Sequence, residues 1–163
     1  MTLPQTLSPQ TPSPQTCAPL IRLPQPRDFQ PWLKLWEGYN TFYGRPGAVP
    51  GADRTWARFF DGREEIHCFV AEHDGVLVGL VHFLYHAHTR LPAPNCYLQD
   101  LFTAEAARGL GVGRALIAAV HAHARANQAF QVYWHTHESN ATARRLYDGV
   151  AERSGFIVYR QLL

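Results

Sequence analysis

The run Arg108-Gly109-Leu110-Gly111-Val112-Gly113 constrains this chain more than any other part of its sequence. Alternating glycines let the backbone adopt positive φ and allow a ligand to approach it closely. The segment 113–127 follows directly, and its apolar residues recur with helical spacing. The first N–H groups of such a helix lack partners, and the positive end of its dipole points toward the loop. The run therefore predicts a strand-to-helix turn that binds an anion such as a pyrophosphate.

Two common phosphate loops do not fit this run. A Walker loop places Lys-Ser or Lys-Thr after its last glycine, whereas Arg114-Ala115 follows here. A dinucleotide fingerprint requires G-x-G-x-x-G, and the last position holds Arg114 when counted from Gly109 and Leu116 when counted from Gly111. The alternative is a turn that only closes a strand onto a helix, although tight turns rarely need three alternating glycines.

Apolar periodicity around the run predicts a single α/β domain over residues 20–163. Residues 1–19 are dominated by Pro, Gln, Thr and Ser, which predicts a disordered tail. Antiparallel hairpins come first and β-α-β crossovers later, so we expect a mixed sheet of six to seven strands flanked by about four helices. Asp28 is expected to cap the first helix. Strands are expected at 21–23, 66–72, 76–88, 96–103, 130–136 and 156–162, and helices at 29–43, 54–60, 113–127 and 140–148.

Composition excludes several classes of function. The chain has 163 residues, 46% apolar and 17% charged, with a formal net charge of +2, which suits a globular protein and gives no nucleic-acid footprint. No apolar run approaches the roughly 20 residues of a membrane span, and the N-terminus lacks the pattern of a signal peptide. Cys17, Cys68 and Cys96 form no C-x-x-C pair, so a disulfide framework is not expected. A reducing, cytoplasmic compartment is the simplest fit.

A second motif, Asn140-Ala-Thr-Ala-Arg-Arg-Leu-Tyr147, lies some thirty residues downstream. At helical spacing, Asn140, Ala143 and Tyr147 share one face, with a small residue between a polar group and a phenol. Taken alone, Asn140 would be interpreted as a helix N-cap and Tyr147 as a core aromatic.

Together the two motifs resemble those of the GNAT superfamily of N-acetyltransferases. Arg108-x-x-Gly111-x-Gly113, followed by Arg114-Ala-Leu-Ile, is similar to its motif A, and 140–147 to its later Asn-Ala-Leu-Tyr motif. The resemblance implies that the glycine loop holds the coenzyme A pyrophosphate, that strand 101–103 pairs with the pantetheine arm and that Asn140 contacts it. It also implies that the Tyr147 hydroxyl protonates the departing thiolate. The coenzyme-binding residues expected from this resemblance are Leu101, Phe102, Thr103, Arg108, Gly109, Leu110, Gly111, Val112, Gly113, Arg114, Asn140, Ala143 and Tyr147.

The activity expected on this basis is that of an acetyl-CoA-dependent N-acetyltransferase, an acyltransferase whose primary amine acceptor attacks the thioester directly in a ternary complex. Acceptors left open are small-molecule amines and protein or peptide amines. The alternatives are an enzyme that uses a longer acyl-CoA and a coenzyme-binding module without catalysis. A chromatin-type binding protein is disfavoured because the chain has no basic cluster.

A general base must take the proton of the ammonium acceptor, and Asp100 and Glu138 are the acidic candidates near the catalytic strands. His135 is a candidate for lining the acceptor site. His82, His86 and His88 share one parity on a predicted strand, but they are too spread for a structural zinc site, so no metal is expected. Cys96 is interpreted as a buried apolar residue rather than an acyl-carrying nucleophile.

A narrower resemblance concerns the branch of fungal histone/polyamine acetyltransferases and their bacterial relatives. It is carried by 97–102, 133–140 and 152–156. Gly155-Phe156 comes eight residues after Tyr147, whereas many superfamily members place it about five after, so acceptor identity does not carry over. The branch forms oligomers through its C-terminal region, here 153–162. The apolar run 156–159 also indicates a strand covered on both faces, so we expect a homodimer, with a monomer as the alternative.

Overall fold

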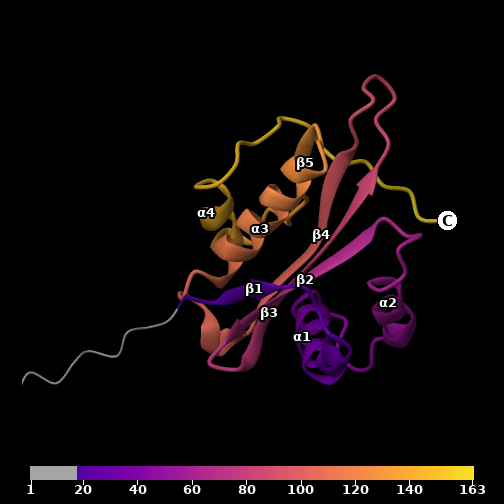
Figure 1. The fold of residues 1–163 in the computed structure, drawn as a ribbon. Helices are drawn as coiled ribbons and strands as arrows, with labels where there is room; N and C mark the ends of the chain where they lie inside the picture. The colour runs from indigo at the N-terminus through magenta and orange to yellow at the C-terminus, as the bar shows by residue number, and fades with distance from the viewer. Residues whose placement is uncertain (1–17) are drawn as a thin grey trace, which may run out of the picture.

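The computed structural model describes residues 18–163, so the tail expected at 1–19 lies almost entirely outside the described residues. These residues form a five-stranded sheet in the order β1-β2-β3-β4-β5, with helices on both faces (Figure 1). All neighbouring pairs are antiparallel except β4 and β5, which are parallel. The mixed α/β architecture with four α-helices is as expected from the sequence.

Apart from the strand expected at 156–162, the elements follow the expected order with small shifts at their ends. The sequence predicts α1 and α3 because each carries a buried apolar stripe at helical spacing. The strands are β1 (Leu20–Arg22), β2 (Ile66–His73), β3 (Val76–His86), β4 (Asn95–Thr103) and β5 (Gln131–Tyr133). The helices are α1 (Phe29–Phe42), α2 (Ala52–Arg58), α3 (Val112–Ala126) and α4 (Ala141–Tyr147), with 3₁₀ turns η1 (Pro26–Asp28) and η2 (Glu105–Ala107).

The sheet separates two apolar layers, because alternate residues of its central strands face opposite sides. On β3, Val81 and Phe83 join the core beneath α3, whereas Leu80 joins the core beneath α1 and α2. Trp32 of α1 is completely buried in the second layer. Figure 1 shows α3 and α4 on one side of the sheet and α1 and α2 on the other. The end of β4 therefore has helices on both sides.

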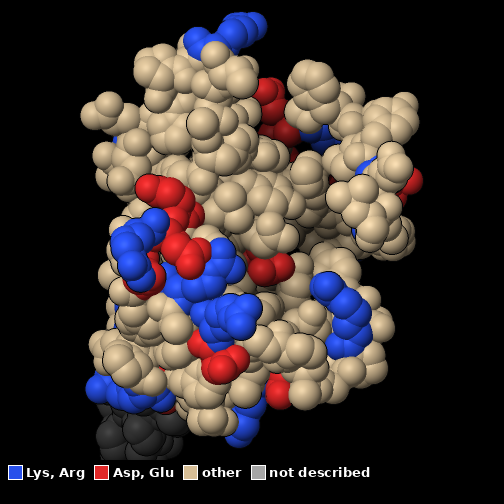
Figure 2. Space-filling model, turned by 90° about the vertical axis from the view of Figure 1, so that its right-hand side faces the viewer, with Lys and Arg blue, Asp and Glu red and all other residues tan. Residues whose placement is uncertain are grey.

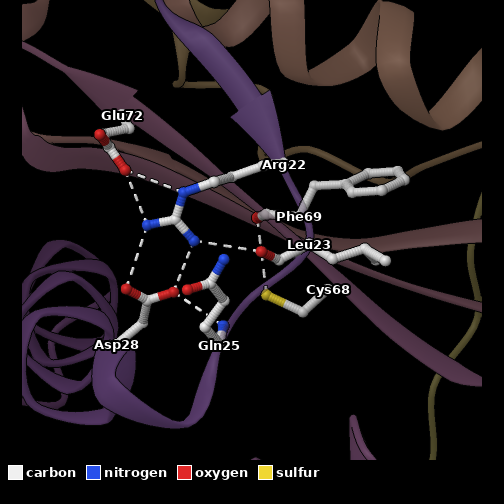
Figure 3. A network of polar contacts seen from close by, with 7 residues as sticks. All are labelled: Arg22, Leu23, Gln25, Asp28, Cys68, Phe69 and Glu72. Atoms are coloured by element: carbon white, nitrogen blue, oxygen red, sulfur yellow. Dashed lines mark hydrogen bonds and ion pairs between the residues drawn. The ribbon is translucent and has the colours of Figure 1, made fainter.

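Asp28 does not cap α1 through its side chain, contrary to the sequence prediction. Its carboxylate instead accepts hydrogen bonds from the guanidinium of Arg22 at 2.6 and 3.1 Å and from the backbone N–H of Gln25 at 2.7 Å (Figure 3). Arg22 also reaches Glu72 of β2 at 2.8 Å. The cation of Arg22 attracts the carboxylate more strongly than a neutral cap would, and its hydrogen bonds hold the pKa of Asp28 below the ordinary value. This network ties β1 to β2 and to the start of α1.

The strand predicted at 156–162 is wrong, and the sheet of the described residues has five strands instead of six to seven. Residues 152–163 form no helix or strand. This segment runs from α4 across the molecule, and the C-terminus lies on the opposite side from α4 (Figure 1). Phe156 is 91% exposed and Tyr159 88% exposed. An apolar run forms a strand only where a sheet edge accepts it, and β5, only three residues long, offers a short edge.

Charged side chains of both signs are mixed on the face shown in Figure 2, where basic and acidic residues lie next to one another. That face carries no broad area of one sign, in line with the modest net charge of +2. Over residues 18–163, no helix is both long enough and apolar enough to span a bilayer.

Candidate active site between β4, α3 and α4

The parallel strands β4 and β5 separate before β4 ends. They pair only over Asn95–Tyr97 and Gln131–Tyr133, whereas the pairing of β4 with β3 continues to Thr103. Beyond Tyr97, no strand of the described residues occupies the other side of β4. The backbone N–H and C=O groups along 98–103 that are not bonded to β3 therefore face a gap and are available to an extended ligand. Leu101, Phe102 and Thr103, the residues expected to pair with pantetheine, lie on this edge.

The glycine loop leads from this edge into α3. Gly109 and Gly111 have φ of 86° and 78°, in the left-handed region that favours glycine, and Gly111 is the N-cap of α3. A Cβ at either position would meet nothing within 4 Å, so the loop is open above its backbone. The first intrahelical bond after the cap is donated by Ala115, which leaves the N–H groups of 112–114 pointing out of the helix. This geometry fits a pyrophosphate, and the side chain of Arg108 is half exposed beside the loop.

Helix α4 packs against the start of α3 because Gly113 has no side chain. A Cβ on Gly113 would lie 3.1 Å from a methyl carbon of Leu146 and 3.8 Å from the hydroxyl oxygen of Thr103. The end of β4, the start of α3 and the end of α4 therefore meet around one residue. The glycine loop and the Asn140–Tyr147 motif therefore lie next to one another.

Tyr147 is half buried at the end of α4, with its ring edge-on to Trp134 at 5.3 Å between centroids. Burial, with a smaller contribution from Tyr43, raises the pKa of Tyr147 to about 12. The hydroxyl is therefore protonated at every pH at which the protein would act. The residue is at once a packed aromatic and a phenol that can donate a proton.

Asn140 is the N-cap of α4, which was the alternative interpretation of this residue. Its side-chain oxygen accepts a hydrogen bond from the backbone N–H of Ala143 at 3.3 Å. Its amide nitrogen lies 3.5 Å from the Thr136 hydroxyl, at the outer limit of hydrogen bonding. The oxygen fixes the start of α4, and the amide N–H₂ is the group with donor capacity left for a ligand.

A bulge at Gln99 changes the facing of the side chains along β4. Leu98 is opposite Phe83 and Asp100 is opposite His82, so Gln99 has no partner of its own on β3. Leu98 packs in the core beneath α3, and in a regular strand Asp100 would face the same way. The bulge turns Asp100 to the α1 side, where it meets His82.

Asp100 and His82 form a buried pair that the sequence did not predict. Nδ1 of His82 lies 3.0 Å from Oδ2 of Asp100, and the side chains are 5% and 14% exposed. Burial, and then the charge of Asp100, raises the pKa of Tyr39 on α1. The sequence grouped His82 only with His86 and His88. Its partner Asp100 lies 18 residues away along the chain. The bulge that turns Asp100 toward His82 leaves no sign in the pattern of apolar residues.

Glu138, the second candidate base, is exposed in the loop between β5 and α4. Its backbone carbonyl accepts a hydrogen bond from Arg144 at 3.0 Å, and none of the described hydrogen bonds involves its carboxylate. The structure thus brings Asp100, but not Glu138, into a hydrogen-bonded network at the edge of β4.

Aromatic side chains lie where the pairing of β4 with β5 ends and the gap begins. The rings of Tyr97 and Tyr133 lie 5.0 Å apart, and the Tyr97 hydroxyl lies 3.1 Å from Nδ1 of His135. Burial raises the pKa of Tyr97, and electrostatic interactions with the ionisable groups of Tyr133, Asp100 and Tyr43 raise it further. His135, the candidate for lining the acceptor site, therefore lies next to Tyr97. The tyrosines were missed because aromatic residues on strands are usually core residues.

Neither a cysteine nucleophile nor a metal site is supported by the described residues. Cys96 is fully buried, and burial raises the pKa of its thiol to about 11, so a thiolate nucleophile is not available there. Within residues 18–163, no group of three or more His, Cys, Asp or Glu side chains is placed to hold a metal ion.

Comparison with known proteins agrees with this geometry. The model of the acetyltransferase (GNAT) family matches residues 32–150. The chain is 31% identical over 144 residues to the D-amino-acid N-acetyltransferase HPA3 of Saccharomyces cerevisiae, covering 87% of this chain and 89% of that protein. It is 30% identical over 128 residues to the uncharacterized N-acetyltransferase YhfO of Bacillus subtilis, covering 77% of this chain and 85% of that protein.

A solved structure of a transcriptional regulator from Bacillus halodurans C-125 shares the fold. Its TM-score is 0.78 at 15% identity, over 89% of this chain and 99% of that one. At such low identity the likeness shows the fold alone, whereas the family match and the two relatives bear on activity. The chain belongs to the GNAT family and is an N-acetyltransferase with acetyl-CoA as its co-substrate.

Proposed function

We propose that this protein transfers the acetyl group of acetyl-CoA to the primary amine of a small molecule by direct attack in a ternary complex. The observation that carries the proposal is the half-buried carboxylate of Asp100, held by His82 where the free edge of β4 begins. Asp100 is a residue of β4, the strand along which the thioester would be held, so a base here is close to the reacting groups. A packed, protonated phenol, Tyr147, lies across the same gap on α4.

Each step has a group to perform it. Asp100 takes a proton from the ammonium form of the acceptor, directly or through water, which leaves a neutral amine. The amine nitrogen forms a bond to the thioester carbon, and the oxyanion that develops is stabilised by a backbone N–H of the β4 edge. The carbon–sulfur bond then breaks, and Tyr147 gives its proton to the departing thiolate. The attacking nitrogen loses its extra proton to the Tyr147 phenolate, directly or through water, which leaves the neutral amide and restores the phenol. Glu138 is a second candidate base, but its exposure leaves it no fixed orientation.

The surroundings of Asp100 favour an organic cation as the acceptor. Tyr97, Tyr133 and His135 form an aromatic wall beside a negative charge, which suits an ammonium attached to an apolar body. The yeast relative is named as acting on D-amino acids, so amino acids are the first class to test. The 31% identity to a fungal protein also supports placing the chain in the fungal branch and its bacterial relatives.

The activity test is thiol release from acetyl-CoA with a panel of D- and L-amino acids, polyamines, aminoglycosides and amine-bearing peptides. The proposal expects thiol release that depends on a small-molecule amine and yields its N-acetyl derivative. Turnover with peptides alone would overturn the small-molecule assignment. Faster turnover with a longer acyl-CoA would favour the alternative acyl donor, and coenzyme binding without thiol release would favour a non-catalytic module.

We also propose that the chain is a homodimer formed through residues 153–162. Phe156, Ile157, Val158 and Tyr159 are all exposed in the single chain, which is an apolar run longer than most monomers leave in water. A second copy of the same segment would cover it through a self-complementary contact. Light scattering is expected to give twice the 18.4 kDa chain mass, and a mass of one chain that does not change with concentration would rule the dimer out.

The described cysteines Cys68 and Cys96 are both buried and unpaired, which supports a reducing, cytoplasmic compartment as part of this proposal.

A further inference from the structure

One hydrogen-bonded chain joins two buried side chains, Trp32 and His82, to the half-buried Asp100. The indole nitrogen of Trp32 on α1 lies 2.9 Å from Nε2 of His82 on β3. The other ring nitrogen of His82, Nδ1, lies 3.0 Å from Oδ2 of Asp100 on β4. Trp32 is 0% exposed and His82 4%, so water does not compete for these contacts.

The chemistry of Trp32 determines which nitrogen of His82 carries the proton. An indole N–H donates hydrogen bonds and cannot accept them, so Nε2 of His82 must be the acceptor. The hydrogen of a neutral imidazole is then on Nδ1, where it is donated to the carboxylate of Asp100. A doubly protonated ring would set an N–H against the N–H of Trp32.

The packing around His82 prevents the ring from turning to a different arrangement. Its centroid lies 5.0 Å from Phe59, 5.6 Å from Trp36 and 5.7 Å from Trp32. On β2 the residue opposite is Cys68, whose pKa is raised by burial, so this neighbour contributes a neutral thiol. Tyr39 and Tyr97 also lie near Asp100, and burial raises the pKa of both, so these neighbours are neutral phenols. Asp100 therefore faces a neutral donor in an apolar setting.

We infer that His82 is a positioning residue that orients Asp100 as the base, with Trp32 selecting the tautomer that His82 must have. This inference rests on the proposed function of Asp100. A cation in place of the neutral imidazole would stabilise the carboxylate charge and make it a weaker base, whereas a neutral donor fixes the carboxylate without that loss. The same bulge at Gln99 that turns Asp100 toward α1 makes this contact possible.

A matched pair of variants separates this role from packing. His82→Asn retains an N–H donor that can reach Asp100, and His82→Leu has nearly the same shape without the donor. With the preferred amine, we expect His82→Leu to lower kcat by about 10²-fold, the lower end of the effect of losing a general base. His82→Asn is expected to stay close to the wild-type kcat, and the KM for acetyl-CoA should be unchanged in both. Equal kcat values for the two folded variants would overturn the inference.

A second measurement does not depend on turnover. Long-range ¹H–¹⁵N correlation spectra of the wild-type protein at neutral pH should show His82 with its proton on Nδ1 alone. Trp32→Phe, which removes only the indole donor from that contact, should allow the other tautomer to appear. A wild-type signal with the proton on Nε2 would overturn the inference even if the enzyme is active. Failure of the proposed function looks different, because the wild-type protein would then release no thiol with any small-molecule amine.

Discussion

Gly113 of α3 and Leu146 of α4 are in contact so close that a Cβ on Gly113 would lie 3.1 Å from a Leu146 methyl carbon. The contact connects the two motifs physically, because Tyr147 follows Leu146 directly. The position of the phenol is therefore set by the helix that begins at the glycine loop.

Replacing Gly113 with alanine should displace Leu146 by a few tenths of an ångström and move Tyr147 with it. We expect kcat to fall by about tenfold, because small displacements of catalytic groups are costly. Stability should change little, because the gain in helix propensity of about 1 kcal/mol offsets the crowding. Gly62→Ala, where a Cβ would meet nothing within 4 Å, is the control. A kcat for Gly113→Ala equal to that of Gly62→Ala would refute the coupling of the two motifs.

Gly111→Asp and Gly111→Asn are a pair that tests the coenzyme site. Both residues would have to adopt the backbone φ of 78° found at Gly111, which Asp and Asn tolerate better than most residues. Only Asp adds a negative charge. Two like charges some 4 Å apart near a protein surface repel by about 4 kcal/mol. The KM for acetyl-CoA should therefore rise at least about tenfold more with Asp than with Asn. A similar rise in both variants would place the pyrophosphate elsewhere.

These local features explain how much the sequence could predict. The turns at Gly109 and Gly111 and the face shared by Asn140 and Tyr147 depend on residues within two helical turns, so spacing alone predicted the loop and α4. The contact of Trp32 with His82 joins residues 50 positions apart. It requires α1 to lie across β3, and the pairing of His82 with Asp100 requires a bulge in β4. Neither is present in the periodicity of a single segment.

The C-terminal prediction failed for a related reason. The apolar run 156–159 has the composition of a strand, but a strand also needs a partner edge. In the described chain the run pairs with no strand edge, and it is exposed. The composition of the run indicates that these apolar residues gain stability from burial. It does not indicate whether the same chain or a second copy buries them.

Asp28 gives a prediction about stability and acid. Its pKa is lowered by the Arg22 hydrogen bonds, so its contribution to stability is present above the ordinary pKa of an aspartate and is lost as pH falls below about 4. Asp28→Asn should reduce the free energy of unfolding by about 3 kcal/mol at neutral pH, as expected when a buried ion pair is broken. The difference in unfolding free energy between the wild-type protein and Asp28→Asn should become smaller in acid. Urea denaturation at several pH values measures this difference.

Asp61→Asn is the control for that experiment, since Asp61 pairs with an Arg63 side chain that is 89% exposed. Its removal should leave the unfolding curve at neutral pH unchanged. Equal effects of the two substitutions would show that the Arg22 network does not anchor β1.

The pH profile of kcat tests the protonation state of Tyr147. Because burial raises its pKa to about 12, the phenol should not ionise below about pH 11, so it should cause no decline in kcat over that range. A basic limb near pH 10 that disappears in Tyr147→Phe would contradict this expectation.

The central claim, that Tyr147 donates a proton to the departing thiolate, is tested most directly by the kcat of Tyr147→Phe. The substitution removes one oxygen atom and leaves the ring to pack edge-on against Trp134. The account predicts a fall in kcat of about 10²- to 10⁴-fold, the range for loss of a general acid, with the KM for acetyl-CoA little changed. A Tyr147→Phe enzyme that turns over at the wild-type rate would contradict it.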